Sequence, residues 1–271
     1  EVVLNNHHTV SVTDELIISA CTNVTMSNGV RIFVEGRITV EGTSNCPVYF
    51  DYAGGGDHMG IQFNSTSNGR GSRIDNASII HSTYGLTIYG SDPYLANVTI
   101  WNADDVGVDM FNSATPTIRD MVIDEAGQDW NFPTYWRYGI GLSIGAGSAP
   151  NIDGLTISDA VTRGVNLWGN SGGLLRNITI SNITGATLSV PAGIWVEDSI
   201  PLITDVNINR ADNGVFVRHQ TPSWITRPSF SNLIIENSQY RGVMVEQYNH
   251  SQYFNLPTNA IFNNLEIRGT G

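Results

Sequence analysis

The stretch Leu175-Arg176-Asn177-Ile178-Thr179-Ile180 is one copy of a six-residue motif that recurs along this chain. In every copy the first, fourth and sixth positions are apolar, Ala77 being the smallest residue among them, and the sixth position is always Ile. The copies span residues 74–79, 95–100, 118–123, 152–157, 175–180, 203–208, 230–235 and 262–267. Their starts lie 21, 23, 34, 23, 28, 27 and 32 residues apart, so the basic turn is about 22 residues, which is a solenoid period.

The third position of the motif predicts a bend at the same point of every turn. Its residues are Asn76, Asn97, Asp120, Gly154, Asn177, Asp205, Asn232 and Asn264. Asn, Asp and Gly are the residues that tolerate a left-handed backbone. A chain that bends once at the same place in each turn forms a coil.

A second motif lies between these copies and predicts a strand with one buried face. It starts at Gly60, Gly85, Gly107, Gly139, Gly164, Gly193, Gly214 and Gly242, and the first and third residues after each Gly are apolar. Turns of this length cannot hold a helix and two strands. We therefore predict an all-β chain, a parallel β-helix with three short strands per turn.

Together with residues 36–43 and the following Pro47-Val48-Tyr49-Phe50, the repeat resembles the right-handed parallel β-helix proteins of the pectate-lyase-like superfamily. More narrowly it is similar to secreted or surface β-helix proteins of archaea and bacteria. The resemblance covers nearly the whole chain and implies a single-stranded right-handed coil. It implies no single activity, because the superfamily includes lyases, glycoside hydrolases, esterases and noncatalytic surface proteins.

Composition narrows the classes of function. The chain has 271 residues with a formal charge of −12, and its 13 basic residues are all Arg. The negative charge argues against binding to nucleic acid or anionic membranes, and the absence of Lys excludes a P-loop and Schiff-base chemistry. No apolar run is long enough to span a membrane.

The uninterrupted repeat predicts a single domain over residues 1–271, with residues 1–23 as an N-terminal cap region and coils from about residue 24 onward. A chain that starts at Glu1 without a signal peptide reads as a mature or excised domain. Only four residues follow the last copy of the motif, so we expect an abrupt C-terminal coil end and further domains of a longer chain.

Cys21 and Cys46 are the only cysteines, and they lie close to one turn apart. That spacing suits a disulfide, and the alternative is a pair of buried free thiols. A bridge implies an extracellular or cell-surface location. The chain also has Asn-X-Ser/Thr sequons. Those at Asn76, Asn97 and Asn177 occupy the bend position, where we expect a structural asparagine ladder.

Four insertions relative to the basic turn border the Gly-led strands, at residues 127–137, 184–191, 219–228 and 247–258. Three are rich in aromatic residues, which disfavours disorder. Between them lies the outward face of the Gly-led strands. Its first column reads Gln62, Thr87, Asp109, Gly141, Asn166, Trp195, Phe216 and Met244, and its second reads Asn64, Tyr89, Phe111, Ser143, Trp168, Glu197, Arg218 and Glu246.

Outward aromatic side chains predict a groove in which rings stack on sugars, unless the insertion loops simply cover them. The enzymes of the superfamily that this chain resembles have their substrate cleft on the corresponding sheet. We expect the cleft between residues 109 and 246, walled by residues 127–137, 219–228 and 247–258. The candidate glycan-binding residues are Trp168, Trp195, Phe216, Tyr89, Phe111, Asn166, Trp136, Tyr135, Trp224 and Tyr248.

Weak catalytic candidates are Glu197, Arg218, Glu246 and Asp109. The two glutamates and the arginine stack on successive turns, either as an ion-pair ladder or with the glutamates as acid and base of an inverting glycosidase. The Asp104-Asp105 pair has an equivalent turn at Asp212-Asn213, so turn chemistry explains it. The histidines show no metal-ligand spacing. Calcium is the cation that acids such as Asp104, Asp105 and Asp109 would suit.

Two functions remain open. No catalytic set known from the superfamily is complete, which favours a noncatalytic glycan-binding or structural surface module. The alternative is a polysaccharide-degrading enzyme, either a lyase or an inverting glycoside hydrolase. Both predict a polysaccharide or surface glycan as the partner, and the sequence indicates no organic cofactor.

Overall fold

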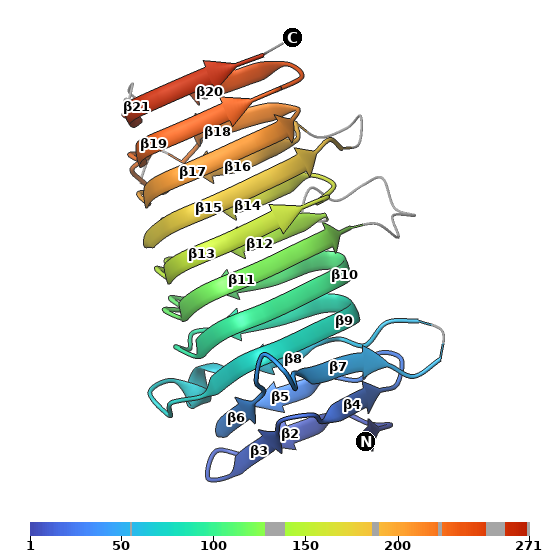
Figure 1. Ribbon diagram of the computed structural model, residues 1–271. Coiled ribbons are helices and arrows are strands. Elements are labelled where there is room, and N and C mark those ends of the chain that lie inside the picture. Colours follow the sequence, from blue (N-terminus) through green and yellow to red (C-terminus); the bar gives the residue numbers. More distant parts are fainter. Residues whose placement is uncertain (55, 128–138, 186–189, 222–223, 248–257, 270–271) are drawn as a thin grey trace.

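The computed structural model describes residues 1–54, 56–127, 139–185, 190–221, 224–247 and 258–269. It confirms the predicted all-β coil: strands stack in parallel from β1 to β21 along one axis (Figure 1). The strands are β1 (Val2–Leu4), β2 (His8–Val10), β3 (Glu15–Ser19), β4 (Asn23–Met26), β5 (Ile32–Val34), β6 (Arg37–Glu41), β7 (Val48–Tyr52), β8 (Ile61–Phe63), β9 (Arg73–Tyr89), β10 (Tyr94–Phe111), β11 (Thr117–Ala126), β12 (Ile140–Ile144), β13 (Asn151–Ser158), β14 (Arg163–Leu167), β15 (Leu174–Ile183), β16 (Ala192–Glu197), β17 (Leu202–Ala211), β18 (Asn213–His219), β19 (Ser229–Glu236), β20 (Arg241–Gln247) and β21 (Ile261–Arg268), with a 3₁₀ turn η1 (Ser65–Ser67).

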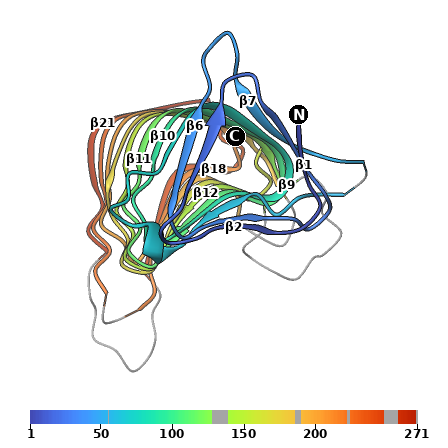
Figure 2. The ribbon, with the colours of Figure 1, turned by 90° about the horizontal axis from the view of Figure 1, so that it is seen from below.

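Viewed along its axis, the coil encloses a core between three strand faces (Figure 2). The first two faces meet at the predicted bend, so that strands such as β15 and β17 run across both. The third is the Gly face, formed by β2, β5, β8, the ends of β9 and β10, and then β12, β14, β16, β18 and β20, each in parallel register with the next. One continuous apolar core fills the coil, with Ile178, Ile180 and Val206 among its residues.

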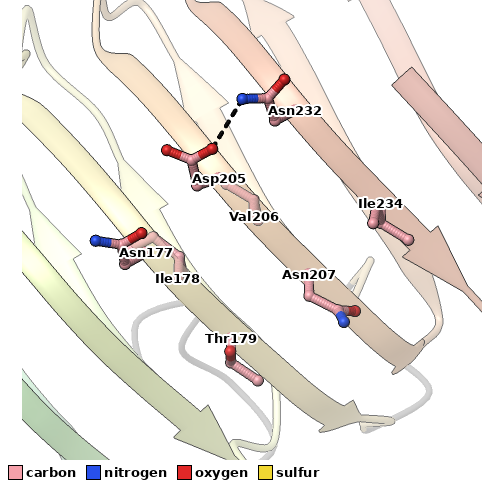
Figure 3. Close-up of a pocket in the computed structure, with 8 residues that line it drawn as sticks. All are labelled: Asn177, Ile178, Thr179, Asp205, Val206, Asn207, Asn232 and Ile234. Carbon is pink, nitrogen blue, oxygen red and sulfur yellow. Dashed lines mark hydrogen bonds between the residues drawn. The ribbon is translucent and has the colours of Figure 1, made fainter. Parts of the chain in front are cut away.

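The predicted bend is left-handed in every copy. The φ angles run from 47° at Asn76 to 57° at Asn177, and reach 83° at Gly154. Side chains at or beside the bend bond from turn to turn: Asn177 Nδ2 donates to Asp153 Oδ1 at 2.5 Å, and Asn232 Nδ2 donates to Asp205 Oδ1 at 2.8 Å. Asp153 precedes the bend residue Gly154, and a continuous asparagine ladder through Asn76, Asn97 and Asn177 stays a prediction. Figure 3 shows the second of these bonds beside a hollow of about 440 Å³ on the outer surface. Asn177, Asp205 and Asn232 of this hollow are thus engaged in bonds between turns.

A second left-handed bend, five residues after the first, closes the second face and was not predicted. It falls at His81, Asn102, Glu125, Asp159, Asn182, Arg210 and Asn237, with φ between 53° and 57°. Glu and Arg carry no local preference for this conformation. The geometry of the coil imposes the bend on them.

The pairing of a Gly with an invariant Ile has a steric cause. A Cβ placed on Gly107 would lie 2.5 Å from Cγ2 of Ile123, and one on Gly164 would lie 2.7 Å from Cγ2 of Ile180. In seven turns, from Gly85 with Ile100 to Gly242 with Ile267, the sixth-position Ile therefore fills the space that the Gly of the Gly face leaves open. Both sequence motifs describe this one contact inside the coil.

The register of one turn differs from the prediction by two residues. The prediction placed Gly139 and Gly141 at the first and third positions of the motif. In the structure, however, Val108 pairs with Leu142 and Asp109 with Ser143. The stacked glycine of this turn is Gly141, so Ser143 belongs to the first outward column and Gly145 follows in the second. The insertion before this strand removed the spacing on which the alignment depended.

The N-terminal residues also differ from the expected cap. β1, β2 and β3 form a coil of their own, in parallel register with β4, β5 and β6. At the other end, β21 is largely exposed, including Ile261, Leu265 and Ile267. No helix among the described residues is long and apolar enough to cross a membrane.

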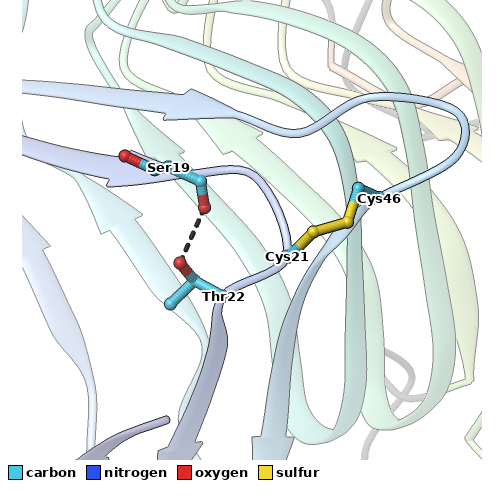
Figure 4. The surroundings of a disulfide bond; sticks show 4 residues. All are labelled: Ser19, Cys21, Thr22 and Cys46. Atoms are coloured by element: carbon cyan, nitrogen blue, oxygen red, sulfur yellow. Dashed lines mark hydrogen bonds between the residues drawn. A yellow bond between two sulfur atoms is a disulfide. The ribbon is translucent and has the colours of Figure 1, made fainter.

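The predicted disulfide between Cys21 and Cys46 is confirmed (Figure 4). The two Cα atoms are 4.7 Å apart, because the residues lie on neighbouring coils. The backbone N–H of Cys21 also donates to the carbonyl oxygen of Cys46 at 3.2 Å. The bridge therefore joins the first two coils where β3 turns toward β4.

Candidate functional site

A cavity of about 680 Å³ lies on the outer side of the Gly face, over β10, β12, β14, β16 and β18. The strands present alternate side chains outward, so residues of neighbouring coils meet there in columns. The cavity is lined by Tyr84, Val106, Asp109, Phe111, Ile140, Ser143, Arg163, Asn166, Trp168, Trp195, Glu197, Arg218 and Gln220. It overlaps the predicted cleft, which was to run from residue 109 to residue 246, but it begins earlier, at Tyr84 of β9, and ends at Gln220.

Three outward columns line this cavity, and the sequence prediction considered only two of them. The first column contains Asp109, Ser143, Asn166 and Trp195 in direct register. The missed column lies three residues earlier, immediately before each Gly, and contributes Tyr84, Val106, Ile140 and Arg163. Strict period-2 alternation would place these residues on the inward face with Val108 and Leu142, so the alternation could not have found this column.

Stacked aromatic and cationic groups form one side of the cavity. The rings of Trp195 and Phe216 lie parallel with centroids 4.0 Å apart, and the Arg163 guanidinium carbon is 4.0 Å from the Trp195 centroid. Trp195 and Phe216 are only 4% and 2% exposed. These two rings were predicted to be open stacking surfaces, but they are mostly covered. Their main role in the structure is packing.

Trp168 is the half-buried tryptophan of the cavity. Its indole Nε1 donates to the Ser143 hydroxyl at 3.4 Å. The ring lies over Gly145, where an added Cβ would come within 2.1 Å of Trp168 Cε2. The absence of a side chain at Gly145 thus gives the indole its place.

The charged groups of the cavity surround Glu197. Burial raises the pKa of the Glu197 carboxyl, while Arg218, Arg163 and a hydrogen bond from Trp195 lower it. Burial also lowers the pKa of Arg163 to about 10, although Glu197 opposes this shift. Arg163 Nη1 donates to Asn166 Oδ1 at 2.7 Å. A carboxyl with a raised pKa between two guanidinium groups can hold a proton for donation to a bound ligand.

Glu197, Arg218 and Glu246 lie on successive strands in direct register. Arg218 Nε is 3.9 Å from Glu246 Oε2, so this ion pair of the suggested ladder is present. Glu246 is not among the residues that line the cavity. At the far end of the cavity Tyr84 also hydrogen-bonds to Asp105, whose pKa is raised by burial and lowered by this bond.

The remaining predicted residues are spread more widely. Tyr89 is 37% exposed and contacts Phe111 edge to face, with centroids 5.0 Å apart, and of these two only Phe111 lines the cavity. Trp224 is exposed and does not line the cavity. Tyr135, Trp136 and Tyr248 lie outside the described residues, as do most of the wall segments 127–137 and 247–258. Calcium at Asp104, Asp105 and Asp109 stays a prediction; within the described ranges no three His, Cys, Asp or Glu side chains form a metal-binding group.

The family described as "Right handed beta helix region" matches residues 131–264. No curated protein resembles the sequence closely enough to count as a match. Among solved structures, an alginate lyase from Paenibacillus sp. str. FPU-7 is similar, with a TM-score of 0.59 and 11% identity over 93% of this chain and 99% of that one.

Two structures of the catalytic domain of a GH87 α-1,3-glucanase are also similar. One, a variant in complex with nigerose, has a TM-score of 0.59 and 16% identity. The other, a variant in complex with tetrasaccharides, has a TM-score of 0.61 and 13% identity. Each match covers 99% of this chain, which spans 59% and 52% of those two chains respectively.

At these identities the likeness shows the fold alone. The preference for a noncatalytic module is nevertheless wrong: the neighbours reported above are polysaccharide-acting enzymes or their catalytic domains, and they support the enzyme alternative. The incompleteness of the catalytic sets known from the superfamily therefore did not exclude an enzyme.

Proposed function

Because this chain is a right-handed parallel β-helix repeat protein, we propose that it is a polysaccharide-degrading enzyme that acts on a glycan in the cavity of the Gly face. The observation that carries the proposal is the placement of Glu197. Its carboxyl lies in a cavity large enough for sugar residues, next to Trp168 and between Arg163 and Arg218. The disulfide supports a secreted or cell-surface enzyme.

The chemistry best supported is glycoside hydrolysis with Glu197 as the proton donor. Burial holds its pKa up, as a general acid requires. An inverting hydrolase needs a second carboxylate about 6.5–9.5 Å away. Strands are about 4.8 Å apart, so Asp109, three strands away, is at about 14 Å at the backbone, whereas Glu246, two strands away, is at about 9.6 Å.

The spacing therefore assigns different roles to the two acids. Glu246 is the candidate base, and Arg218 Nε lies 3.9 Å from its Oε2. Asp109 and Asn166, which line the cavity in the first column, would accept or donate hydrogen bonds to sugar hydroxyls. Trp168 offers an apolar ring face to the sugar.

A second candidate reaction is cleavage of a uronate-containing polymer by a lyase. Arg163 and Arg218 favour it, since guanidinium groups in a partly dry cavity pair well with carboxylates. In that case the arginines would neutralise the uronate carboxylate, and the C–H group next to that carboxylate would then lose its proton more easily.

One assay separates the two. The protein is incubated with neutral and acidic polysaccharides, and reducing ends and the ultraviolet absorbance of unsaturated products are followed. Reducing ends without unsaturated products indicate a hydrolase, and both together indicate a lyase. We expect Glu197→Gln to lower kcat at least about 100-fold, as loss of a general acid does, and Glu41→Gln, on an exposed strand position, to leave it unchanged. No product from any polymer, or full activity of Glu197→Gln, would contradict the proposal.

A further inference from the structure

Asp198, the residue after Glu197, is a buried carboxylate beside the cavity. It is 1% exposed and sits in a left-handed conformation with φ 49°. Its Oδ1 accepts the backbone N–H of Gln220 at 2.8 Å, and its Oδ2 accepts that of Thr221 at 2.9 Å. One side chain therefore holds the backbone where the chain leaves β18, just beyond Arg218.

Two further buried groups hold Asp198 in place. His219 Nδ1 is 3.3 Å from Asp198 Oδ1, and the hydroxyl of Thr226 donates to the same oxygen at 3.4 Å. His219 and Thr226 are 6% and 1% exposed and contact each other at 3.1 Å. Burying a carboxylate is costly unless it is hydrogen-bonded, and these partners meet that requirement. A buried network satisfied in this way also fixes the positions of its members.

The segment that Asp198 holds carries Gln220, whose exposed side chain reaches into the cavity. With its amide nitrogen toward Glu197, Gln220 donates to Oε1 at 3.0 Å and to Oε2 at 3.3 Å. In this orientation the amide meets both oxygens of the carboxylate. That contact sets the plane of the carboxyl relative to the cavity.

We infer that Asp198 and Gln220 are positioning residues of the site: Asp198 holds the backbone of Gln220, and the Gln220 amide holds the carboxyl of Glu197. The inference rests on the proposed function, since it gives both residues a part in a reaction in which Glu197 donates the proton. A proton donor must present one oxygen to the bond that breaks, and a carboxyl free to rotate does so less often.

The first test measures the ionisation of Glu197 directly by NMR, in protein carrying ¹³C-labelled glutamate carboxyls. The signal of Glu197 is identified by its loss in Glu197→Gln. Arg163, Arg218, Asp198 and the Trp195 indole also act on this carboxyl and are unchanged in the comparison. Removing the amide with Gln220→Ala takes away donors to the charged form, so we expect an upward pKa shift on the order of one unit.

Gln220→Glu, which adds a second carboxylate, is expected to shift the pKa of Glu197 further upward than Gln220→Ala does. Gln239→Ala, at an exposed glutamine outside the cavity, is the matched control and should shift nothing. An unchanged pKa in Gln220→Ala would overturn the contact between the amide and Glu197.

The second test asks whether Asp198 acts through Gln220. The shift in the pKa of Glu197 caused by Gln220→Ala is measured again in protein that carries Asp198→Asn. Both proteins of this second pair lack the charge of Asp198, so its direct effect on Glu197 cancels in the difference between them. We expect the shift to fall to less than half of its original size. An equal shift in both backgrounds would overturn the positioning role of Asp198.

Hydrogen exchange of the native protein tests the same link without relying on the folding of Asp198→Asn. The backbone amides of Gln220 and Thr221 should exchange at least about tenfold more slowly than those of an unstructured chain, although they lie outside any strand. Exchange at the rate of an unstructured chain would overturn the anchoring by Asp198. On a polymer that the enzyme cleaves, Gln220→Ala should move the alkaline limb of the pH–rate profile, where the proton donor Glu197 ionises, upward in parallel. If no polymer is cleaved, the proposed function fails while the titration and exchange results still stand or fall on their own.

Discussion

The stability of this protein should depend on pH through one buried histidine, His58, which is fully buried. Its Nδ1 accepts the backbone N–H of Gly60 at 2.9 Å, and its Nε2 donates to the carbonyl oxygen of Ile80 at 3.0 Å. These two bonds fit the neutral ring, with the proton on Nε2. Burial lowers the pKa of His58 from 6.5 to about 4, despite the opposing effects of the Ile80 bond and of Asp51 and Asp57.

The sign follows from proton binding. Between pH 6.5 and 4 the unfolded chain binds a proton at this histidine and the native protein does not, so the free energy of unfolding falls as the pH falls. The full difference of 2.5 pKa units corresponds to about 3 kcal/mol, and roughly 2 kcal/mol of it is already lost at pH 5. Above about pH 7.5 the contribution of His58 is constant.

The perturbation is His58→Asn, whose side-chain oxygen can still accept the bond from Gly60. Urea unfolding of both proteins at pH 7.5 and pH 5 gives the difference between them at each pH. Asp105, Glu197 and Asp212, whose pKa values burial raises, act in the opposite direction, but they cancel in this comparison. Wild type should lose about 2 kcal/mol more than the variant between the two pH values.

An NMR titration of the imidazole provides the direct check. The His58 signal of the native protein should stay that of a neutral ring down to about pH 4. A midpoint near 6.5, or the same pH dependence of unfolding in wild type and His58→Asn, would show that the ring is not held neutral by burial and its two hydrogen bonds.

The two cavity tryptophans should separate binding from packing. Trp168→Ala is expected to weaken the binding of a glycan substrate by about 1–3 kcal/mol with little change in Tm. Trp195→Ala removes a buried stacked ring and should lower the free energy of unfolding by about 3–5 kcal/mol. Titration calorimetry and thermal melts of both variants check this, and a reversed pattern would contradict the assignment. Replacing Cys21 and Cys46 together by Ser opens a link over 25 residues and should cost about 3 kcal/mol of stability, seen as a lower Tm than that of the oxidised protein; equal melting of the two would mean that the first coils do not limit stability.

Where the sequence alone led to the correct structure, the signal was local and repeated. Asn177 and its equivalents carry an intrinsic tolerance for left-handed backbone, and all of them adopt it. The Gly and Ile motifs were recognisable because one steric contact, such as that of Gly164 with Ile180, recurs in seven turns. Cys21 and Cys46 could be paired because their separation is close to one turn.

Tertiary structure decided what no single residue encodes. Glu125 and Arg210 adopt left-handed bends only because the coil must close at that point in every turn. The register at Gly141 could not be predicted, since the insertion before it breaks the period, and the pairing of Val108 with Leu142 settles it through hydrogen bonds between strands. The sequence therefore determined that this chain forms a β-helix and which of its faces carries unusual side chains. The burial of Trp195, the approach of Arg163 and the Gln220 amide that meets Glu197 depend on how the coils and the segment after β18 pack together.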